Sequence, residues 1–128
     1  SGATYVAYCF AEKKGYSKFG SYVGNGNANG AFVYTGFKPA FVMIKITNDT
    51  GENWQMYDNK RTGFNVDNNM LRANLNNAEQ TDDDIDLLSN GFKLRRSSGS
   101  FNSDGANYIY MAFGQSIVGS NNVPANAR

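Results

Sequence analysis

Apolar and aromatic residues occur in short runs that are separated by Gly, Asn, Asp and Ser. Such runs, when rich in aromatic and β-branched residues, are typical of β-strands. The clearest are residues 5–10, 41–47, 92–95 and 108–113, and residues 31–34, 53–57 and 85–88 are further candidates. Many short strands with polar turns between them predict an all-β domain, and specifically an antiparallel β-sandwich.

Two local signals refine this prediction. Residues 85–88 run into Ser89-Asn90-Gly91, and an Asn-Gly pair favours a type I′ hairpin turn with two positive φ angles. Pro39 precedes the run 41–47, where it can open a strand without removing a hydrogen bond from its middle. Residues 40–44 are apolar at every position, so we expect a central strand there.

The expected core contains five large apolar side chains from the two strongest runs. They are Phe41, Met43, Ile44, Ile109 and Phe113. Two other segments look irregular. Residues 15–30 are rich in Gly and Asn and predict a connection or a poorly paired hairpin, and residues 69–78 predict a loop with at most one helical turn.

The sequence contains an internal echo. Residues 2–10, Gly-Ala-Thr-Tyr-Val-Ala-Tyr-Cys-Phe, align without gaps on residues 105–113, Gly-Ala-Asn-Tyr-Ile-Tyr-Met-Ala-Phe. Repetition at about one domain length suggests a unit of a tandem array, although any two aromatic strands share some likeness. We therefore expect residues 1–128 to be one β-sandwich domain and a fragment, C-terminal or repeated, of a larger protein.

Composition and charge exclude some classes of partner. Twelve Lys and Arg against eleven Asp and Glu leave a net charge of +1, without the positive surface that nucleic-acid binding needs. No apolar run approaches the ~20 residues that span a bilayer, so we expect a soluble domain without membrane insertion. The one cysteine, Cys9, lies in an apolar run and is expected to be buried.

Candidate catalytic residues are few, because the sequence contains no histidine. Ser-His-Asp and Cys-His mechanisms are therefore excluded in their ordinary forms. A pair of carboxylates could still hydrolyse a glycan, and the available residues are Glu12, Glu52, Asp58, Glu79 and the run Asp82, Asp83, Asp84 and Asp86. None has a diagnostic context, so we expect no enzyme, no catalytic residue and no cofactor.

A run of acidic residues is the only candidate metal site. Asp82, Asp83, Asp84 and Asp86 supply the hard oxygen ligands that Ca²⁺ prefers, but their spacing matches no EF-hand. Acidic runs are more often solvated turns. We expect a solvated loop and no metal, and calcium binding stays an open alternative.

Aromatic residues raise the question of carbohydrate binding. Trp54 and Tyr57, together with Tyr16 and Tyr22, could form a platform on which sugar rings stack. Core aromatic residues have the same appearance in a sequence, and that interpretation is favoured. Ligand-binding residues are therefore not assigned.

Four segments together carry a family resemblance. They are residues 5–12 (Tyr-Val-Ala-Tyr-Cys-Phe-Ala-Glu), 34–45 (Tyr-Thr-Gly-Phe-Lys-Pro-Ala-Phe-Val-Met-Ile-Lys), 89–95 (Ser-Asn-Gly-Phe-Lys-Leu-Arg) and 108–113 (Tyr-Ile-Tyr-Met-Ala-Phe). In this order they resemble a domain of unknown function of bacteriophage proteins, especially of marine phages. Gly114-Gln115 stands where that family usually has Ala-Glu. The resemblance supplies no site residues.

The resemblance implies a virion setting and a non-enzymatic role. We expect a structural or host-surface-recognition module of a tail fibre or capsid decoration, exposed on the virion. Its partners would be other virion proteins and a host-surface glycan, and in a fibre it would form a homotrimer. The alternatives are a carbohydrate-binding module and a carboxylate-dependent glycan depolymerase.

Overall fold

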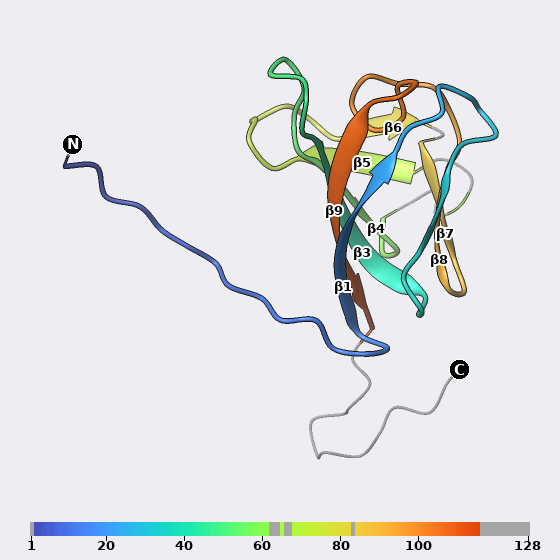
Figure 1. Ribbon diagram of the computed structural model, residues 1–128, viewed down its shortest axis with the longest axis horizontal. Helices are drawn as coiled ribbons and strands as arrows, with labels where there is room; N and C mark the ends of the chain where they lie inside the picture. Colours follow the sequence, from blue (N-terminus) through green and yellow to red (C-terminus); the bar gives the residue numbers. More distant parts are fainter. Residues whose placement is uncertain (1, 62–64, 66–67, 83, 116–128) are drawn as a thin grey trace.

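The chain forms two antiparallel β-sheets that pack together, as the computed structural model shows for residues 2–61, 65, 68–82 and 84–115 (Figure 1). Strands contain 43% of these described residues, and no helix occurs among them. The predicted all-β sandwich is therefore confirmed.

The larger sheet has six strands in the order β1-β9-β3-β4-β5-β6, and the smaller has the order β2-β8-β7. The strands are β1 (Ser17–Val23), β2 (Phe32–Tyr34), β3 (Pro39–Ile46), β4 (Gln55–Asp58), β5 (Asn68–Arg72), β6 (Gln80–Asp82), β7 (Ile85–Leu88), β8 (Gly91–Leu94) and β9 (Asn107–Gly114). Strand β9 pairs with β1 on one side and with β3 on the other.

Six of the seven predicted strands are confirmed, as β2, β3, β4, β7, β8 and β9. Pro39 is the first residue of β3, where its ring removes no hydrogen bond from the middle of the strand. Strand β3 lies between β9 and β4, which confirms the expectation of a central position. Its alternating burial, with Val42, Ile44 and Ile46 inward, shows that its two faces differ.

The strand predicted at residues 5–10 is wrong. Residues 2–12 form no strand and run away from the sandwich as an extended N-terminal arm (Figure 1). Tyr5, Val6 and Tyr8 are 86%, 78% and 83% exposed, and Cys9, expected in the core, is also exposed. A strand with this aromatic pattern would suit the position between β1 and β3, but β9 occupies that position.

Three strands were not predicted. Strand β1 lies in the segment expected to be irregular, and it forms because it pairs with β9 along its whole length. Gly20 leaves room there for the ring of Tyr110, since a Cβ at Gly20 would lie 3.0 Å from that ring. The segment 69–78, expected to be a loop, contributes most of β5, and β6 follows it.

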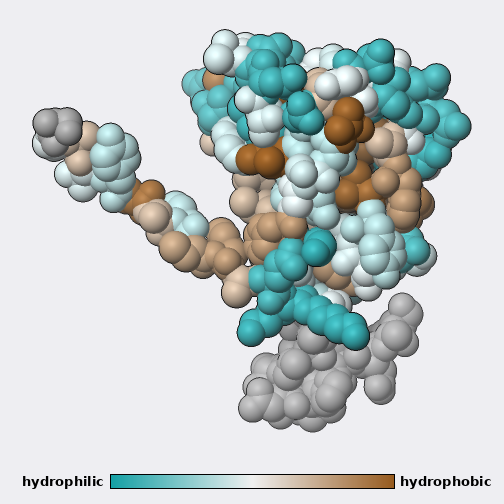
Figure 2. All heavy atoms as spheres, viewed as in Figure 1, coloured by the Kyte–Doolittle hydropathy of each residue, from teal (hydrophilic) through white to brown (hydrophobic). Residues whose placement is uncertain are grey.

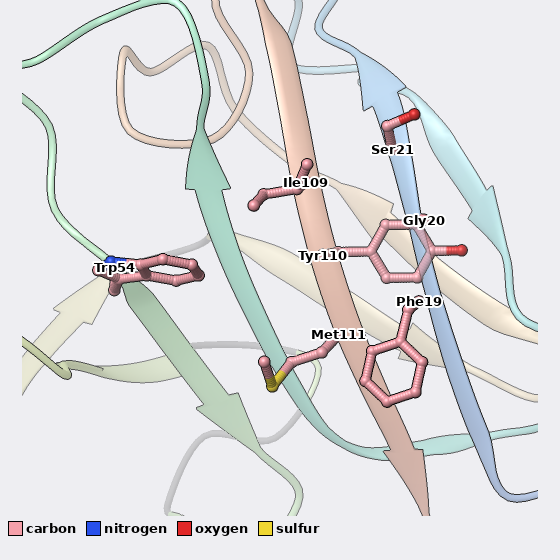
Figure 3. A pocket seen from close by; sticks show the side chains of 7 residues that line it. All are labelled: Phe19, Gly20, Ser21, Trp54, Ile109, Tyr110 and Met111. Carbon is pink, nitrogen blue, oxygen red and sulfur yellow. The ribbon is translucent and has the colours of Figure 1, made fainter. Parts of the chain in front are cut away.

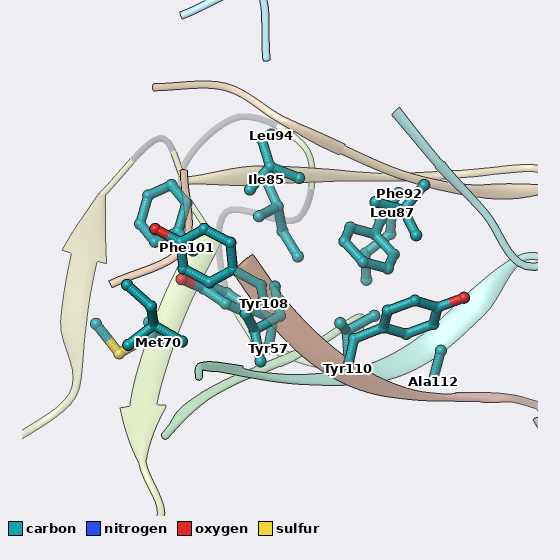
Figure 4. Close-up of a cluster of buried hydrophobic side chains, with 14 of the residues drawn as sticks. Tyr57, Met70, Ile85, Leu87, Phe92, Leu94, Phe101, Tyr108, Tyr110 and Ala112 are labelled. Atoms are coloured by element: carbon teal, nitrogen blue, oxygen red, sulfur yellow. The ribbon is translucent and has the colours of Figure 1, made fainter. Parts of the chain in front are cut away.

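The core lies between the two sheets (Figure 4). Strand β9 contributes Tyr108, Tyr110 and Ala112, which are all buried, and Phe92 of β8 packs edge-on against the ring of Tyr110. Of the residues predicted for the core, Ile44 is fully buried. The others point to the opposite face of the larger sheet.

The four residues on that opposite face are less buried than expected. Phe41, Met43 and Phe113 are only half-buried, and Ile109 is 41% exposed, so its predicted burial is wrong. The reason is the period of two in a strand, which turns Ile109 away from the core when Tyr108 and Tyr110 face it.

Loops at one end of the sandwich are held by buried polar groups. The Tyr108 hydroxyl donates to the Gly99 carbonyl at 2.8 Å, and the Tyr22 hydroxyl donates to the Phe101 carbonyl at 2.6 Å. Asn102, which is fully buried, donates to the Asn27 carbonyl at 2.9 Å. The Asn-rich loop between β1 and β2 is thus fastened to the loop before β9.

The β7–β8 hairpin is confirmed, but its predicted turn is wrong. Leu88 pairs with Gly91, so the two loop residues are Ser89 and Asn90. Neither has a positive φ, which a type I′ turn requires. Gly91 belongs to β8, where a Cβ would lie only 2.2 Å from the Val33 carbonyl oxygen. Glycine is needed there for close approach of β2, not for turn geometry.

We expect Gly91→Ala to reduce the free energy of unfolding by about 3 kcal/mol, because β2 must move to admit the methyl group. Gly105→Ala is the matched control, since Gly105 has a φ of +68° and no atom within 4 Å of an added Cβ. It should cost only about 1 kcal/mol of backbone strain. Urea unfolding of both variants makes the comparison, and equal losses would contradict the steric explanation.

Candidate binding face on the six-stranded sheet

The side of the six-stranded sheet that faces away from the core is largely apolar. Directly paired residues of neighbouring strands point to the same side. Met111 of β9 pairs with Phe19 of β1 and with Met43 of β3, and Met43 in turn pairs with Met56 of β4. We call this side the outer face.

A hollow lies on the outer face beside β9 (Figure 3). Its volume is about 520 Å³, and its lining combines three strands or their ends. The lining residues are Phe19, Gly20, Ser21, Trp54, Ile109, Tyr110 and Met111. Trp54 lies just before β4, where its backbone N–H donates to the Asn74 side chain at 3.1 Å. This hydrogen bond fixes the position of the main chain from which the indole reaches the hollow.

No charged residue lines this hollow in the part of the chain that the structure describes. Lys45 pairs with Ile109 in the β3–β9 ladder and therefore starts from the same face. Its ammonium group, however, donates to the Ile46 carbonyl at 2.9 Å and to the Asp49 carbonyl at 3.4 Å. The charge is thereby drawn to the loop after β3, which leaves the hollow neutral.

Aromatic rings extend the outer face toward the end of β9. The ring of Phe113 lies 5.7 Å from that of Phe19, 6.3 Å from that of Phe41 and 5.5 Å from that of Phe10. Phe10 belongs to the N-terminal arm, so the base of the arm packs on this face. The apolar surface is therefore continuous from Phe10 to the hollow.

The aromatic platform considered from the sequence does not form as one surface. Trp54 lines the hollow, whereas Tyr57 is buried and its hydroxyl group donates a hydrogen bond to the Asp84 carboxylate at 2.9 Å. Tyr22 stacks on Tyr108 at 5.1 Å on the core side. Tyr16 packs edge-on against Phe113 at 6.2 Å. Only Trp54 is left for a ligand in the hollow.

The candidate catalytic carboxylates are not among the residues that line the hollow, and each has a partner. Glu12 accepts a hydrogen bond from the backbone of Phe19, and Glu52 accepts one from Ser100. Asp58 and Glu79 both form ion pairs with Arg61. A guanidinium that contacts both carboxylates holds each of them in an ion pair, which does not suit an acid and base acting on a glycan.

The acidic run divides between two arginines. Arg96 forms ion pairs with Asp82 at 3.0 Å and with Asp84 at 2.7 Å, and Arg95 pairs with Asp86 at 3.3 Å. Asp83 lies outside the described residues. Within the described ranges, no three His, Cys, Asp or Glu residues are placed to hold a metal ion. Each described carboxylate of this run, those of Asp82, Asp84 and Asp86, therefore has an arginine as its partner.

Asp84 differs from its neighbours because it is fully buried. Burial raises the pKa of its carboxyl group, and the Tyr57 hydroxyl and the Arg96 guanidinium partly offset that effect. Burial likewise raises the pKa of the Tyr57 hydroxyl, with a further contribution from the charge of Asp84. The sequence indicated a solvated turn here, and for Asp84 that interpretation is wrong.

These observations define an antiparallel β-sandwich whose larger sheet has a largely apolar outer face. The chain belongs to a family described as a domain of unknown function (DUF7483), whose model matches residues 1–116. No curated protein and no solved structure matches the chain. A search of the described residues for a helix that could cross a membrane finds none.

The alternation of residues along β9 is a sequence signal for the outer face, and residue type alone does not show it. Ile109, Met111 and Phe113 alternate with Tyr108, Tyr110 and Ala112, so β9 is apolar on both sides. A strand with two apolar sides normally has both covered. Here the described chain covers the core side of β9, and it covers the outer side only near Phe113, where Phe10 packs.

We expect Arg96→Met to lower the free energy of unfolding by about 3 kcal/mol, because it leaves the buried Asp84 carboxylate without its counter-charge. Arg95→Met, which removes a partly exposed pair with Asp86, should cost less than about 1 kcal/mol. Urea denaturation at neutral pH compares them. Similar losses would mean that the buried pair has no special role.

The loss in Arg96→Met should shrink on acidification. Without Arg96 the folded-state pKa of Asp84 rises further above its unfolded value, so the folded form takes up a proton first as the pH falls. A neutral carboxyl group no longer needs the guanidinium. The gap between variant and wild type should therefore narrow as the pH falls through that raised pKa, and a constant gap would contradict this assignment.

Proposed function

We propose that the domain is a non-enzymatic structural module of a bacteriophage virion, and that it associates with other protein through its outer face. The observation that carries the proposal is an apolar, uncharged hollow in which Ile109 is exposed and Met111, Phe19 and Trp54 are only partly buried. Monomeric proteins rarely leave continuous apolar patches uncovered unless they bind something there.

The composition of the outer face favours a protein partner. Aromatic residues and Met are enriched at the centres of protein interfaces, and charged residues are depleted there. The hollow has Phe19, Trp54 and Met111 in its lining and no charged side chain. A partner that inserts an apolar side chain would fill it without an unpaired charge.

The virion setting is supported by the resemblance of the four sequence segments to phage proteins. A tail fibre or a capsid decoration needs rigid modules that assemble through surfaces, and a two-sheet scaffold fastened by buried tyrosines suits that role. The partners would be other virion proteins or further copies of the chain. A three-fold fibre requires a contact that closes on itself around an axis.

We expect the full chain to self-associate between about 1 and 100 μM, toward three copies, and Ile109→Glu to weaken association by at least about tenfold. The reason is that a carboxylate at an apolar interface is desolvated without a partner. Ile109 is already 41% exposed, so the variant should keep its fold. Sedimentation velocity measures the masses.

Ser89→Glu is the matched control for this experiment, because it adds the same charge at an exposed turn position of the smaller sheet, across the core from the outer face. It should associate like the wild type. A mass near 14.0 kDa for the wild type at every concentration would contradict self-association through this face.

Carbohydrate binding is the second candidate, and it is favoured by one observation, the presence of an aromatic side chain, Trp54, and a hydroxyl group, Ser21, in the lining of the hollow. Trp54 is the only tryptophan of the chain, so its fluorescence reports directly on the site. Soluble bacterial surface polysaccharides should leave its emission unchanged if the partner is protein. A saturable shift would favour a host-surface glycan as the ligand, and release of reducing ends would favour a depolymerase.

A further inference from the structure

The N-terminal arm, residues 2–12, has the composition of a buried strand but contacts little of its own domain. Tyr5, Val6, Tyr8 and Phe10 are 86%, 78%, 83% and 57% exposed, and the arm extends from the body (Figures 1 and 2). Of these four side chains, Phe10 packs on the sandwich, against Phe19 and Phe113, and Glu12 at the base of the arm is hydrogen-bonded to β1. Such a row of apolar side chains calls for a partner.

The arm repeats the pattern of β9 and of the turn before it. When residues 2–10 are aligned on 105–113, Tyr5 falls on Tyr108 and Cys9 on Ala112, two positions that are fully buried in β9. Val6 falls on Ile109 on the outer face. The alignment thus preserves which side of the strand faces a core.

One position differs in size. Ala7 falls on Tyr110, whose ring fills the space above Gly20. A sheet that receives the arm would therefore carry a larger residue than glycine at the position of Gly20. The arm thus matches β9 as a type of strand, and the smaller Ala7 would be compensated by a larger residue at the position of Gly20 in the sheet that receives it.

A β9-type strand needs a partner on each side. In the described chain β9 is hydrogen-bonded to β1 and to β3, so its own domain offers the arm no such place. The other edge of β1 is also protected, because the Glu12 carboxylate accepts the Phe19 N–H at 3.0 Å and pairs with Lys18 at 3.1 Å. Charges placed at an edge discourage the addition of a strand.

We propose that the arm is a β9-type strand that completes the six-stranded sheet of a neighbouring domain of the same family, between that domain's β1-like and β3-like strands. The arm gains two ladders of main-chain hydrogen bonds, and Tyr5 and Cys9 enter the neighbour's core. Units joined in this way are linked by a shared sheet rather than by a flexible connection. This inference does not depend on the outer face as a binding site.

Strand donation is tested in the full chain by opening the β9 position, in a background that carries Ala7→Tyr, so that the arm has the ring for which Gly20 leaves room. Ile109→Pro removes a backbone N–H from the middle of a central strand and disrupts its pairing. We expect this variant to be rich in β-structure and mostly oligomeric at micromolar concentration. The reason is that the arm of one copy takes the β9 position, between β1 and β3, of the next copy. Circular dichroism and light scattering measure the two properties.

Val6→Pro is the matched variant, since Val6 aligns with Ile109. Alone, it should leave the melting temperature within about 2 °C of the wild type, because the arm is outside the sandwich. Combined with Ile109→Pro, it should abolish assembly and folding. An Ile109→Pro chain that is unfolded at every concentration, or that assembles equally well with Val6→Pro, overturns the proposal.

A graft in the full chain asks the same question without association. Asn107→Thr, Ile109→Val, Met111→Tyr and Ala112→Cys together give β9 the sequence of the arm except at the position of Ala7. We expect a cooperative unfolding transition within about 10 °C of the wild type. A control carries the same new residues one position later, as Tyr108→Thr, Tyr110→Val, Ala112→Tyr and Phe113→Cys, which turns them to the wrong faces.

The control graft should not fold. If the in-register graft also fails to fold, the arm cannot act as a β9-type strand and the proposal is overturned. If both grafts fold equally well, the resemblance carries no information on facing and the proposal is likewise overturned. Neither result depends on whether Ile109→Glu weakens self-association, so the two proposals can fail separately.

Discussion

The architecture depends on the pairing of β9 with β1 and β3. This strand comes last among the described elements, yet it joins the first strand to the third, and without it β1 would have no neighbour in the sheet. Its two sides do different work. Tyr108, Tyr110 and Ala112 close the core, and Ile109, Met111 and Phe113 build the outer face. Changes in β9 therefore alter stability and surface together.

Buried polar groups set the positions of the loops around this sheet. The hydroxyls of Tyr22 and Tyr108 end in the carbonyls of the loop before β9, and Asn102 ties that loop to the Asn-rich connection after β1. Asp84, Tyr57 and Arg96 form the corresponding contact between the two sheets. Because an unpaired buried polar group is costly, these contacts specify one arrangement of otherwise irregular segments.

The sequence predicted the elements whose own residues favour a strand. Aromatic and β-branched residues identified β3, β8 and β9, and the hairpin was visible because β7 and β8 are adjacent in sequence. Strand β1 was missed because Gly20 and Ser21 favour a loop locally, and pairing with β9 overrides that preference. The error at residues 5–10 has the opposite cause, since a strand-forming segment still needs an unoccupied place in a sheet.

The candidate face was harder to predict than the fold. Phe41, Met43, Ile109 and Phe113 were assigned to the core on residue type, and only the layering of the sheets shows that they face the other way. Trp54 reaches the hollow from a loop whose course depends on Asn74, twenty residues further along. The pairing of Asp84 with Arg96 also spans a hairpin, so an acidic run alone indicated solvent.

The Glu12 cap on β1 gives the sheet an edge that responds to acid. The hydrogen bond from the Phe19 backbone, with Lys18, lowers the pKa of the Glu12 carboxyl group, so the charged form persists at a pH where a free glutamate would be protonated. Below that depressed pKa the carboxyl group becomes neutral and its hold on the edge amide weakens. Strong acid would then leave the free edge of β1 open to pairing with another chain and to aggregation. Mild acidity would leave this edge protected.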